Sequence, residues 1–209
     1  MRMKGIILSL SILVYSATCV AQENNNEVVL GVYTGISYAA VSFKALDNLS
    51  SNLDETATVS FETNAPISFE VATRPTEQFS IGLLFSTQSF SGNIDGYTFR
   101  VLEDSVAIED VDLSLNRFFI GITPKYMWKP RDGKIELYSA ARIGYVFWKN
   151  EINSADKSFE LPQLLSLNRP SLGLVPIGGN IYFTEKTTVN FESAIAAPYV
   201  FRIGLQYHL

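Results

Sequence analysis

The residue types that most often perform chemistry are scarce in this chain. It contains one histidine, His208, and one cysteine, Cys19. Acyl-transfer catalysis needs a base beside a nucleophile, and a metal site needs several ligands at set spacings. His208 is one residue from the C-terminus, and we expect it to be an inward-facing or interfacial polar residue without a partner. The sequence therefore predicts no enzyme, no cofactor and no metal site, although a site built from Ser and Lys or from carboxylates alone stays open.

Seven charged residues lie in segments that alternate between apolar and polar positions, and each of them falls on the polar side. A period of two is typical of β-strands, so these side chains are expected to share one face of a sheet. Arginine and carboxylate groups at such close quarters form strong paired hydrogen bonds. We therefore predict an internal ion network of three acids and four bases, which are Glu70, Arg117, Lys125, Glu136, Arg142, Glu192 and Arg202.

Most other acids gather in three long connecting segments, about Ala45 to Ala65, Ser91 to Leu113 and Asn150 to Pro170. These segments carry 13 acids against three bases. The densest group lacks the ordered spacing and the glycine of a calcium-binding loop, so a solvated loop is the favoured interpretation. The alternative is a loop interaction patch that holds a divalent cation, made of Glu103, Asp104, Glu109, Asp110 and Asp112.

Eight alternating runs account for most of the chain, and no convincing helical period interrupts them. Connections between the runs are alternately short and long, as in a transmembrane barrel whose short turns face the periplasm. Pro176 and Gly178-Gly179 interrupt the sixth run and predict a bulge. The runs cover residues 28–43, 67–73, 79–86, 117–128, 135–147, 171–183, 187–193 and 199–209.

The N-terminal segment predicts export. Arg2 and Lys4 precede an apolar run and a small-residue stretch that ends at Ala21, which is typical of a signal peptide. A membrane anchor and a lipoprotein modified at Cys19 are the less favoured alternatives. We assign residues 1–21 to the signal peptide and 22–209 to one barrel domain. Loss of Arg2 and Lys4 lowers the net charge from −5 to −7, which disfavours a nucleic-acid partner.

Aromatic residues favour a membrane barrel over a soluble one of the lipocalin kind. On the apolar side of the runs they cluster at both ends, as expected for the two interfaces of a bilayer. Phe79, Trp128, Phe183 and Tyr207 are assigned to the short-turn end, and Phe90, Phe118, Phe147 and Tyr199 to the long-loop end. Eight strands enclose a lumen that side chains can fill. The fold class is therefore all-β, an eight-stranded antiparallel up-and-down transmembrane barrel with long extracellular loops.

The last run resembles the C-terminal insertion signal of the small bacterial outer-membrane β-barrels, which include the transmembrane domain of outer-membrane protein A and outer-membrane protein X. The matching positions are Arg202, Gly204, Tyr207 and Leu209, although Leu209 stands where Phe is usual. The resemblance covers nearly the whole mature chain. It implies outer-membrane lipid and the barrel-assembly machinery as partners, in the outer membrane of a Gram-negative bacterium.

The extracellular segments are the remaining candidates for function. Alternation at Tyr97, Phe99 and Val101 and again from Thr58 to Glu62 suggests strands that continue beyond the membrane. The edge of such a sheet can pair with an extended segment of another protein. We therefore expect a structural or surface-interaction barrel with a filled lumen and an extracellular protein partner. The alternative is a narrow channel for small solutes.

Overall fold

A computed structural model describes residues 27–42, 44, 58–102, 105–132, 134–154, 168–196 and 198–209. The side chains of residues 58–59, 94–102, 105–111, 129–132 and 150–154 lie outside this description. The predicted signal peptide, residues 1–21, also lies outside it. None of the helices in the described part of the chain is long and apolar enough to cross a membrane.

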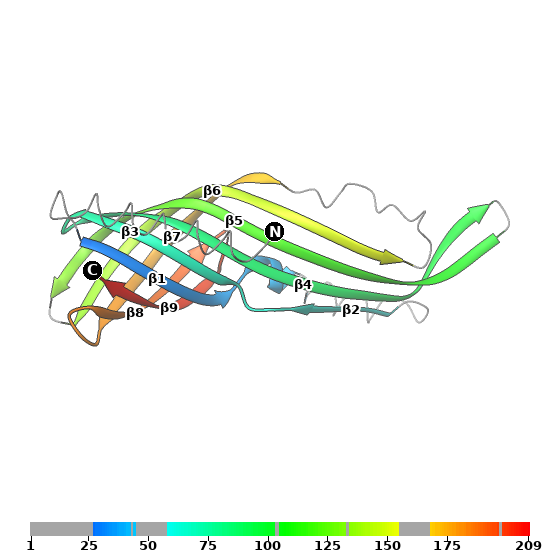
Figure 1. Cartoon of the computed structure of the whole chain (residues 1–209), viewed down its shortest axis with the longest axis horizontal. Coiled ribbons are helices and arrows are strands. Elements are labelled where there is room, and N and C mark those ends of the chain that lie inside the picture. Colours follow the sequence, from blue (N-terminus) through cyan, green and yellow to red (C-terminus); the bar gives the residue numbers. More distant parts are fainter. Residues whose placement is uncertain are drawn as a thin grey trace.

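Eight strands close a ring in which every neighbouring pair is antiparallel (Figure 1). The ring runs β1, β3, β4, β5, β6, β7, β8 and β9, and β9 then pairs with β1. A ninth strand, β2, pairs with the far part of β4 and with no other described strand. The strands are β1 Glu27–Ile36, β2 Thr58–Thr63, β3 Ile67–Thr76, β4 Phe79–Leu102, β5 Ser105–Asp132, β6 Ile135–Ser154, β7 Arg169–Tyr182, β8 Thr187–Ile195 and β9 Phe201–His208.

The predicted eight-stranded barrel is confirmed, with one correction to its strands. The first strand ends at Ile36 and not at Phe43, because residues 38–42 turn into a short helix. The predicted continuation of strands within the long connection from Ser91 to Leu113 is confirmed, because β4 and β5 are paired along it up to Leu102 and Ser105. Short turns join β3 to β4 and β7 to β8, and the C-terminus lies at this end (Figure 1).

A sheet extends beyond the ring at the opposite end (Figure 1). There β2 pairs with residues 90–95 of β4, and β5 pairs with β6 as far as Val111 and Ser154. Pairing between β6 and β7 already stops at Val146 and Arg169. Four strands, in the order β2, β4, β5 and β6, therefore continue past the closed part of the barrel as an open sheet, here called the outer sheet.

The interruption predicted at Pro176 is confirmed. The register between β7 and β8 shifts between Leu174 and Ile177, and the register between β6 and β7 shifts between Tyr138 and Ala140. The hydroxyl of Ser139 donates a hydrogen bond of 2.6 Å to the Pro176 carbonyl. Proline has no N–H to donate, so the ladder bends here and a side chain satisfies the freed carbonyl.

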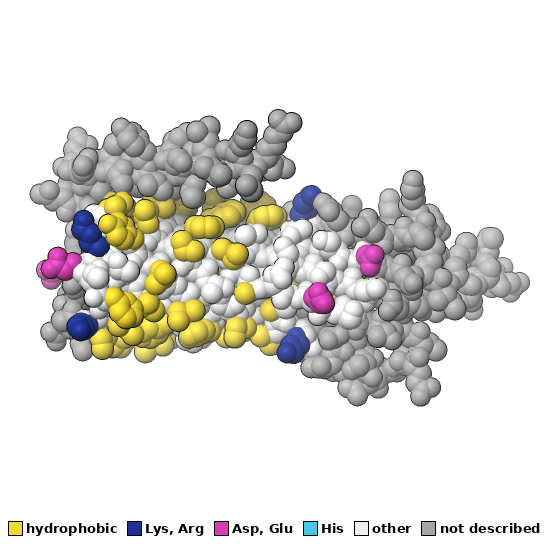
Figure 2. All heavy atoms as spheres, turned by 60° about the horizontal axis from the view of Figure 1, so that its bottom comes forward, with side chains coloured by type: hydrophobic (Ala, Val, Ile, Leu, Met, Phe, Trp, Pro, Cys, Tyr) yellow, Lys and Arg dark blue, Asp and Glu magenta, His cyan; other side chains and the backbone are white. Residues whose placement is uncertain are grey.

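The outward face of the ring carries a belt of apolar side chains (Figure 2). Six of the eight predicted interface aromatics lie on this face; Phe79, Trp128, Phe147, Phe183 and Tyr207 are exposed, and Phe118 is half-buried. The assignments of Phe90 and Tyr199 to the belt are wrong. Phe90 is 2 % exposed and Tyr199 is 0 % exposed, so both point inward. Tyr199 precedes β9, and strand alternation does not apply to it.

Candidate functional site: the filled lumen and the outer sheet

A cluster of ion pairs fills the middle of the lumen. Glu192 on β8 accepts hydrogen bonds from Arg142 and from Arg202, the latter with an Nη2–Oε1 distance of 2.6 Å. The Tyr138 hydroxyl donates to the same carboxylate at 2.5 Å. Glu70 on β3 forms ion pairs with Arg202 on β9 at 2.9 Å and with Lys125 on β5 at 2.7 Å. The cluster therefore joins five strands, β3, β5, β6, β8 and β9. All of these charged groups are buried. We call Glu70, Lys125, Arg142, Glu192 and Arg202 the central cluster.

The central cluster has three cations and two carboxylates, and tyrosine rings accompany the cations. The Arg202 guanidinium lies 3.9 Å from the centre of the Tyr33 ring. Arg142 lies 5.5 Å from the Tyr199 ring, and Lys125 lies 5.5 Å from the Tyr138 ring. The faces of aromatic rings attract cations, most strongly where water is absent. The rings therefore offset part of the excess positive charge.

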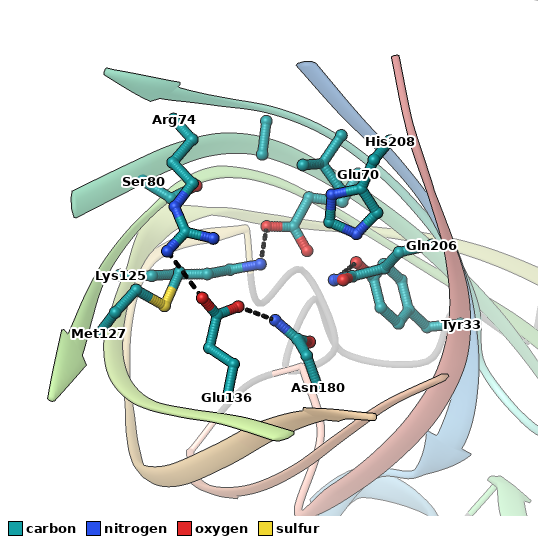
Figure 3. Close-up of a pocket in the computed structure, with 12 residues that line it drawn as sticks. Tyr33, Glu70, Arg74, Ser80, Lys125, Met127, Glu136, Asn180, Gln206 and His208 are labelled. Atoms are coloured by element: carbon teal, nitrogen blue, oxygen red, sulfur yellow. Dashed lines mark hydrogen bonds and ion pairs between the residues drawn. The ribbon is translucent and has the colours of Figure 1, made fainter. Parts of the chain in front are cut away.

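A second layer lies toward the short-turn end (Figure 3). Arg74 pairs with Glu136 at 2.7 Å, and the other oxygen of that carboxylate accepts a hydrogen bond of 2.7 Å from Asn180. Nearby, the Gln206 amide donates to the Tyr33 hydroxyl at 2.9 Å. These side chains surround a cavity of about 20 Å³, which is enough for a single water. The lumen is thus packed with side chains, and the cavity between them is small.

His208 lies at the short-turn rim, and the expectation that it has no partner is wrong. Its Nδ1 is 2.6 Å from Glu27 Oε1 on β1, and its Nε2 is 2.8 Å from the Thr188 hydroxyl on β8. The order acid, imidazole, hydroxyl is that of a catalytic triad, but Thr188 is fully buried and cannot reach a substrate. The three residues connect β1, β8 and β9 where the barrel closes.

Apolar side chains cover the other end of the lumen. Phe90, Leu113 and Leu115 are buried, and the Phe90 ring lies 5.7 Å from the ring of Trp148. On this inner face Phe61 of β2 lies opposite Gly92. The barrel's pattern is therefore inverted in the outer sheet, whose apolar side faces inward and whose polar side faces outward. We call these inward residues the apolar cap.

The structure distributes the seven predicted network residues over three levels. Five of them form the central cluster, while Glu136 lies in the lower layer with Arg74 as its partner. Arg117 lies below the apolar cap and donates to the Pro198 carbonyl at 2.9 Å; no ion pair to it occurs among the described residues. Sequence reasoning missed Arg74, which precedes Pro75 and was assigned to a turn, and it missed Glu27, just ahead of the first run.

The residues that match the insertion signal occupy both faces of β9. Arg202 is fully buried in the central cluster, and Gly204 lies against the Tyr33 ring. Tyr207 and Leu209 are exposed on the outward face, at the end where the chain stops. Arg202 and Gly204 thus make contacts inside the lumen, and Tyr207 and Leu209 form an apolar surface outside it.

The predicted acidic patch falls largely outside the description. Glu103 and Asp104 are not described, and the side chains of Glu109 and Asp110 are not described although their backbone belongs to β5. Asp112 is exposed on β5 and faces outward. Within the described residues no group of three or more histidine, cysteine or acidic side chains could hold a metal ion.

Comparison with known proteins finds similar solved structures alone. No protein-family model and no curated protein matches the sequence. The chain is similar to the outer membrane protein OprG from Pseudomonas aeruginosa, with a TM-score of 0.49 and 9% identity over 88% of this chain and 95% of that one. It is also similar to Ail, the attachment invasion locus protein of Yersinia pestis, with a TM-score of 0.36 and 10% identity over 88% and 93% of the chains.

A third similar structure is the translocator domain of the autotransporter NalP from Neisseria meningitidis, with a TM-score of 0.33 and 8% identity over 98% and 97% of the chains. What decides the class is the closed ring with apolar residues outward and charges inward, since a bilayer requires every backbone group to be paired. The chain is a closed eight-stranded β-barrel of the transmembrane kind.

Proposed function

We propose that this outer-membrane barrel is a sealed anchor that carries the outer sheet at the cell surface and binds extended segments of other proteins through the edges of that sheet. The observation that carries the proposal is the continuation of four strands beyond the closed ring. A barrel that only had to span the membrane would not need paired strands of this length. The central cluster and the apolar cap support the sealed lumen.

Two strand edges are available in the part of the chain that the structure describes. Strand β2 pairs with β4 on one side only, and β6 has no described strand partner on its β7 side after Val146, where the Trp148 N–H donates to the Asn168 side-chain oxygen at 2.8 Å. Unpaired strand edges present rows of N–H and C=O groups that can accept another strand. The acidic character of the long segments favours a partner segment with positive charge.

Panning of a phage-displayed random peptide library against the purified, refolded protein tests the edge-pairing role. We expect basic peptides with alternating side chains, whose binding is lost in Ser60→Pro because proline removes a backbone N–H from β2 and disrupts that short strand. Ser60→Ala is the matched control, since it keeps the N–H. Peptides that bind both variants equally, or that show no extended pattern, would contradict the proposal.

Single-channel recording in planar bilayers separates the sealed barrel from a narrow channel. With Arg142, Arg202 and Glu192 buried in direct contact, we expect no stable conductance steps from the unmodified protein. Steady steps from the unmodified protein, with a defined ion selectivity, would instead support the narrow channel. The edge-binding test does not depend on this result.

A further inference from the structure

Arg117 differs from the other cations inside the lumen because no carboxylate compensates its charge in the described part of the chain. It is 5 % exposed, and among the described residues its guanidinium donates to the Pro198 carbonyl alone. A guanidinium has five N–H donors, so most of those of Arg117 have no acceptor there. The other cations described inside the lumen each form an ion pair; they are Arg74, Lys125, Arg142 and Arg202.

The side chains around Arg117 are neutral and mainly apolar. Along β5 its inward neighbours are Leu115 and Phe119, and both are buried. Across the sheet the register places Gln88 of β4 and Trp148 of β6 directly opposite Arg117. Little water screens a positive charge in such surroundings, so its attraction for an anion is strong.

The outer end of the lumen gives access to Arg117. The outward residues beside it, Ser89 and Asn116, are polar and lie 2.7 Å apart, so Arg117 is near the end of the apolar belt. On the inner side Tyr199 closes the lumen, because it is fully buried and its hydroxyl lies 3.3 Å from Ser86 on β4. Arg117 itself keeps some accessible surface. An anion that enters from outside can therefore reach this guanidinium, and the lumen is closed beyond it.

The single charge of Arg117 and its apolar neighbours indicate which anion fits. A carboxylate is planar and accepts two parallel N–H bonds from one guanidinium. It carries one negative charge, whereas a phosphate dianion would leave a second charge uncompensated between Leu115 and Phe119. Trp148 is half-buried, packs against the cluster that contains Phe119, and lies 5.7 Å from the Phe90 ring. The rest of the ligand would meet this apolar surface.

From these observations we propose that the outer mouth of the lumen, at Arg117 and Trp148, binds short apolar carboxylic acids. The carboxylate accepts two hydrogen bonds from Arg117, and the apolar part lies against Trp148. Because Tyr199 closes the lumen beneath, the ligand binds from the outside and does not cross the barrel. The site is separate from the strand edges, so it does not depend on the proposed edge-binding role.

The test follows the fluorescence of Trp148 in the refolded full-length protein in detergent micelles. Trp128→Phe removes the other tryptophan, which is exposed on the outward face. We expect hexanoate to change the Trp148 emission saturably, whereas hexanol, which lacks the carboxylate, should cause no saturable change. Arg117→Gln should raise the apparent dissociation constant for hexanoate about tenfold or more. Lys149→Gln is the matched control, because Lys149 is an exposed base beside Trp148 that faces outward, and this variant should bind normally.

A second variant, Gln88→Glu, keeps the test decisive if Arg117→Gln folds poorly. It places a carboxylate directly opposite Arg117 with little change in shape, so Arg117 gains an internal partner and hexanoate binding should be lost. The migration of unheated samples on gels shows whether each variant is folded. No saturable response to hexanoate, an equal response to hexanol, or unchanged affinity in folded Arg117→Gln or Gln88→Glu would each overturn the proposal. None of these results bears on the peptide-binding test, which probes β2.

Discussion

At the scale of single residues, Glu192 matters most, because two arginines and a tyrosine share its carboxylate. A buried charge that loses its partner is costly in a place that water does not reach. Arg202 has a second carboxylate in Glu70, whereas Glu192 is the only acid paired with Arg142 among the described residues. The effects of removing these residues should therefore differ.

We predict that Glu192→Gln lowers the free energy of unfolding by ~3–5 kcal/mol, because the neutral amide leaves the buried Arg142 guanidinium without a carboxylate and Arg202 with Glu70 alone. The measurement is urea unfolding of the protein in lipid vesicles, followed by the fluorescence of its two tryptophans. Arg142→Leu should also destabilise the barrel, and Glu185→Gln, at an exposed acid, should not. An unfolding midpoint of Glu192→Gln equal to that of the control would contradict the predicted role of the central cluster.

The contact between Gly31 and Tyr33 leads to a second prediction. A Cβ atom added at Gly31 would overlap the hydroxyl and the ring of Tyr33, which lies inside the lumen beside β9. We therefore expect Gly31→Ala to destabilise the barrel by ~1–3 kcal/mol, as overpacked cores do. In the background of Tyr33→Leu the same substitution should cost clearly less. A double-mutant cycle of unfolding midpoints measures the difference, and additive effects would count against the contact.

At the scale of the strands, alternation alone predicted the barrel order and the inward position of all seven network charges. It failed where a residue leaves the regular strand, as Tyr199 does ahead of β9. Phe90 was placed on the wrong face for another reason, because alternation along β4 puts it inward with Ser86 and Gln88, whereas its apolar ring suggested the lipid face. Arg74 shows a further limit, since a pattern along one strand does not reveal a partner such as Glu136 three strands away around the ring.

Substitutions on the two faces of the last strand, β9, should affect assembly and stability differently. Tyr207 is outward and exposed, whereas Arg202 is buried in the central cluster. We predict that Tyr207→Ala slows insertion into vesicles that contain the purified barrel-assembly machinery but leaves spontaneous folding in thin bilayers nearly unchanged. Arg202→Ala should impair both processes.

Tyr126→Ala is the matched control for Tyr207→Ala, because Tyr126 is another exposed outward tyrosine but lies on β5. Folding yields are read from the gel shift between heated and unheated samples. If Tyr126→Ala slows insertion as much as Tyr207→Ala, the slower insertion is caused by the loss of an outward aromatic ring and not by a change in the C-terminal insertion signal.

At the scale of the whole molecule, the polar and apolar faces exchange places once along the long axis. Within the closed ring the apolar side chains face outward, as Ile120 and Ile143 do, and the charges face inward. In the outer sheet Leu113 and Leu115 face inward, and Asp112 faces outward. Lipid surrounds the first part and water the second, because each side chain pattern suits only one of the two solvents. The exchange therefore marks the outer boundary of the membrane.

This boundary predicts which single cysteines react in living cells. Cleavage after Ala21 would leave a mature chain without cysteine, so each introduced thiol is the only target. Glu62→Cys, on the exposed face of the outer sheet, should react with a membrane-impermeant maleimide on intact cells, whereas Glu185→Cys in the short turn should react only after the outer membrane is permeabilised. Labelling of both in denatured protein controls for thiol oxidation. The reverse pattern would place the outer sheet in the periplasm, and edge pairing with an extracellular partner would then be impossible.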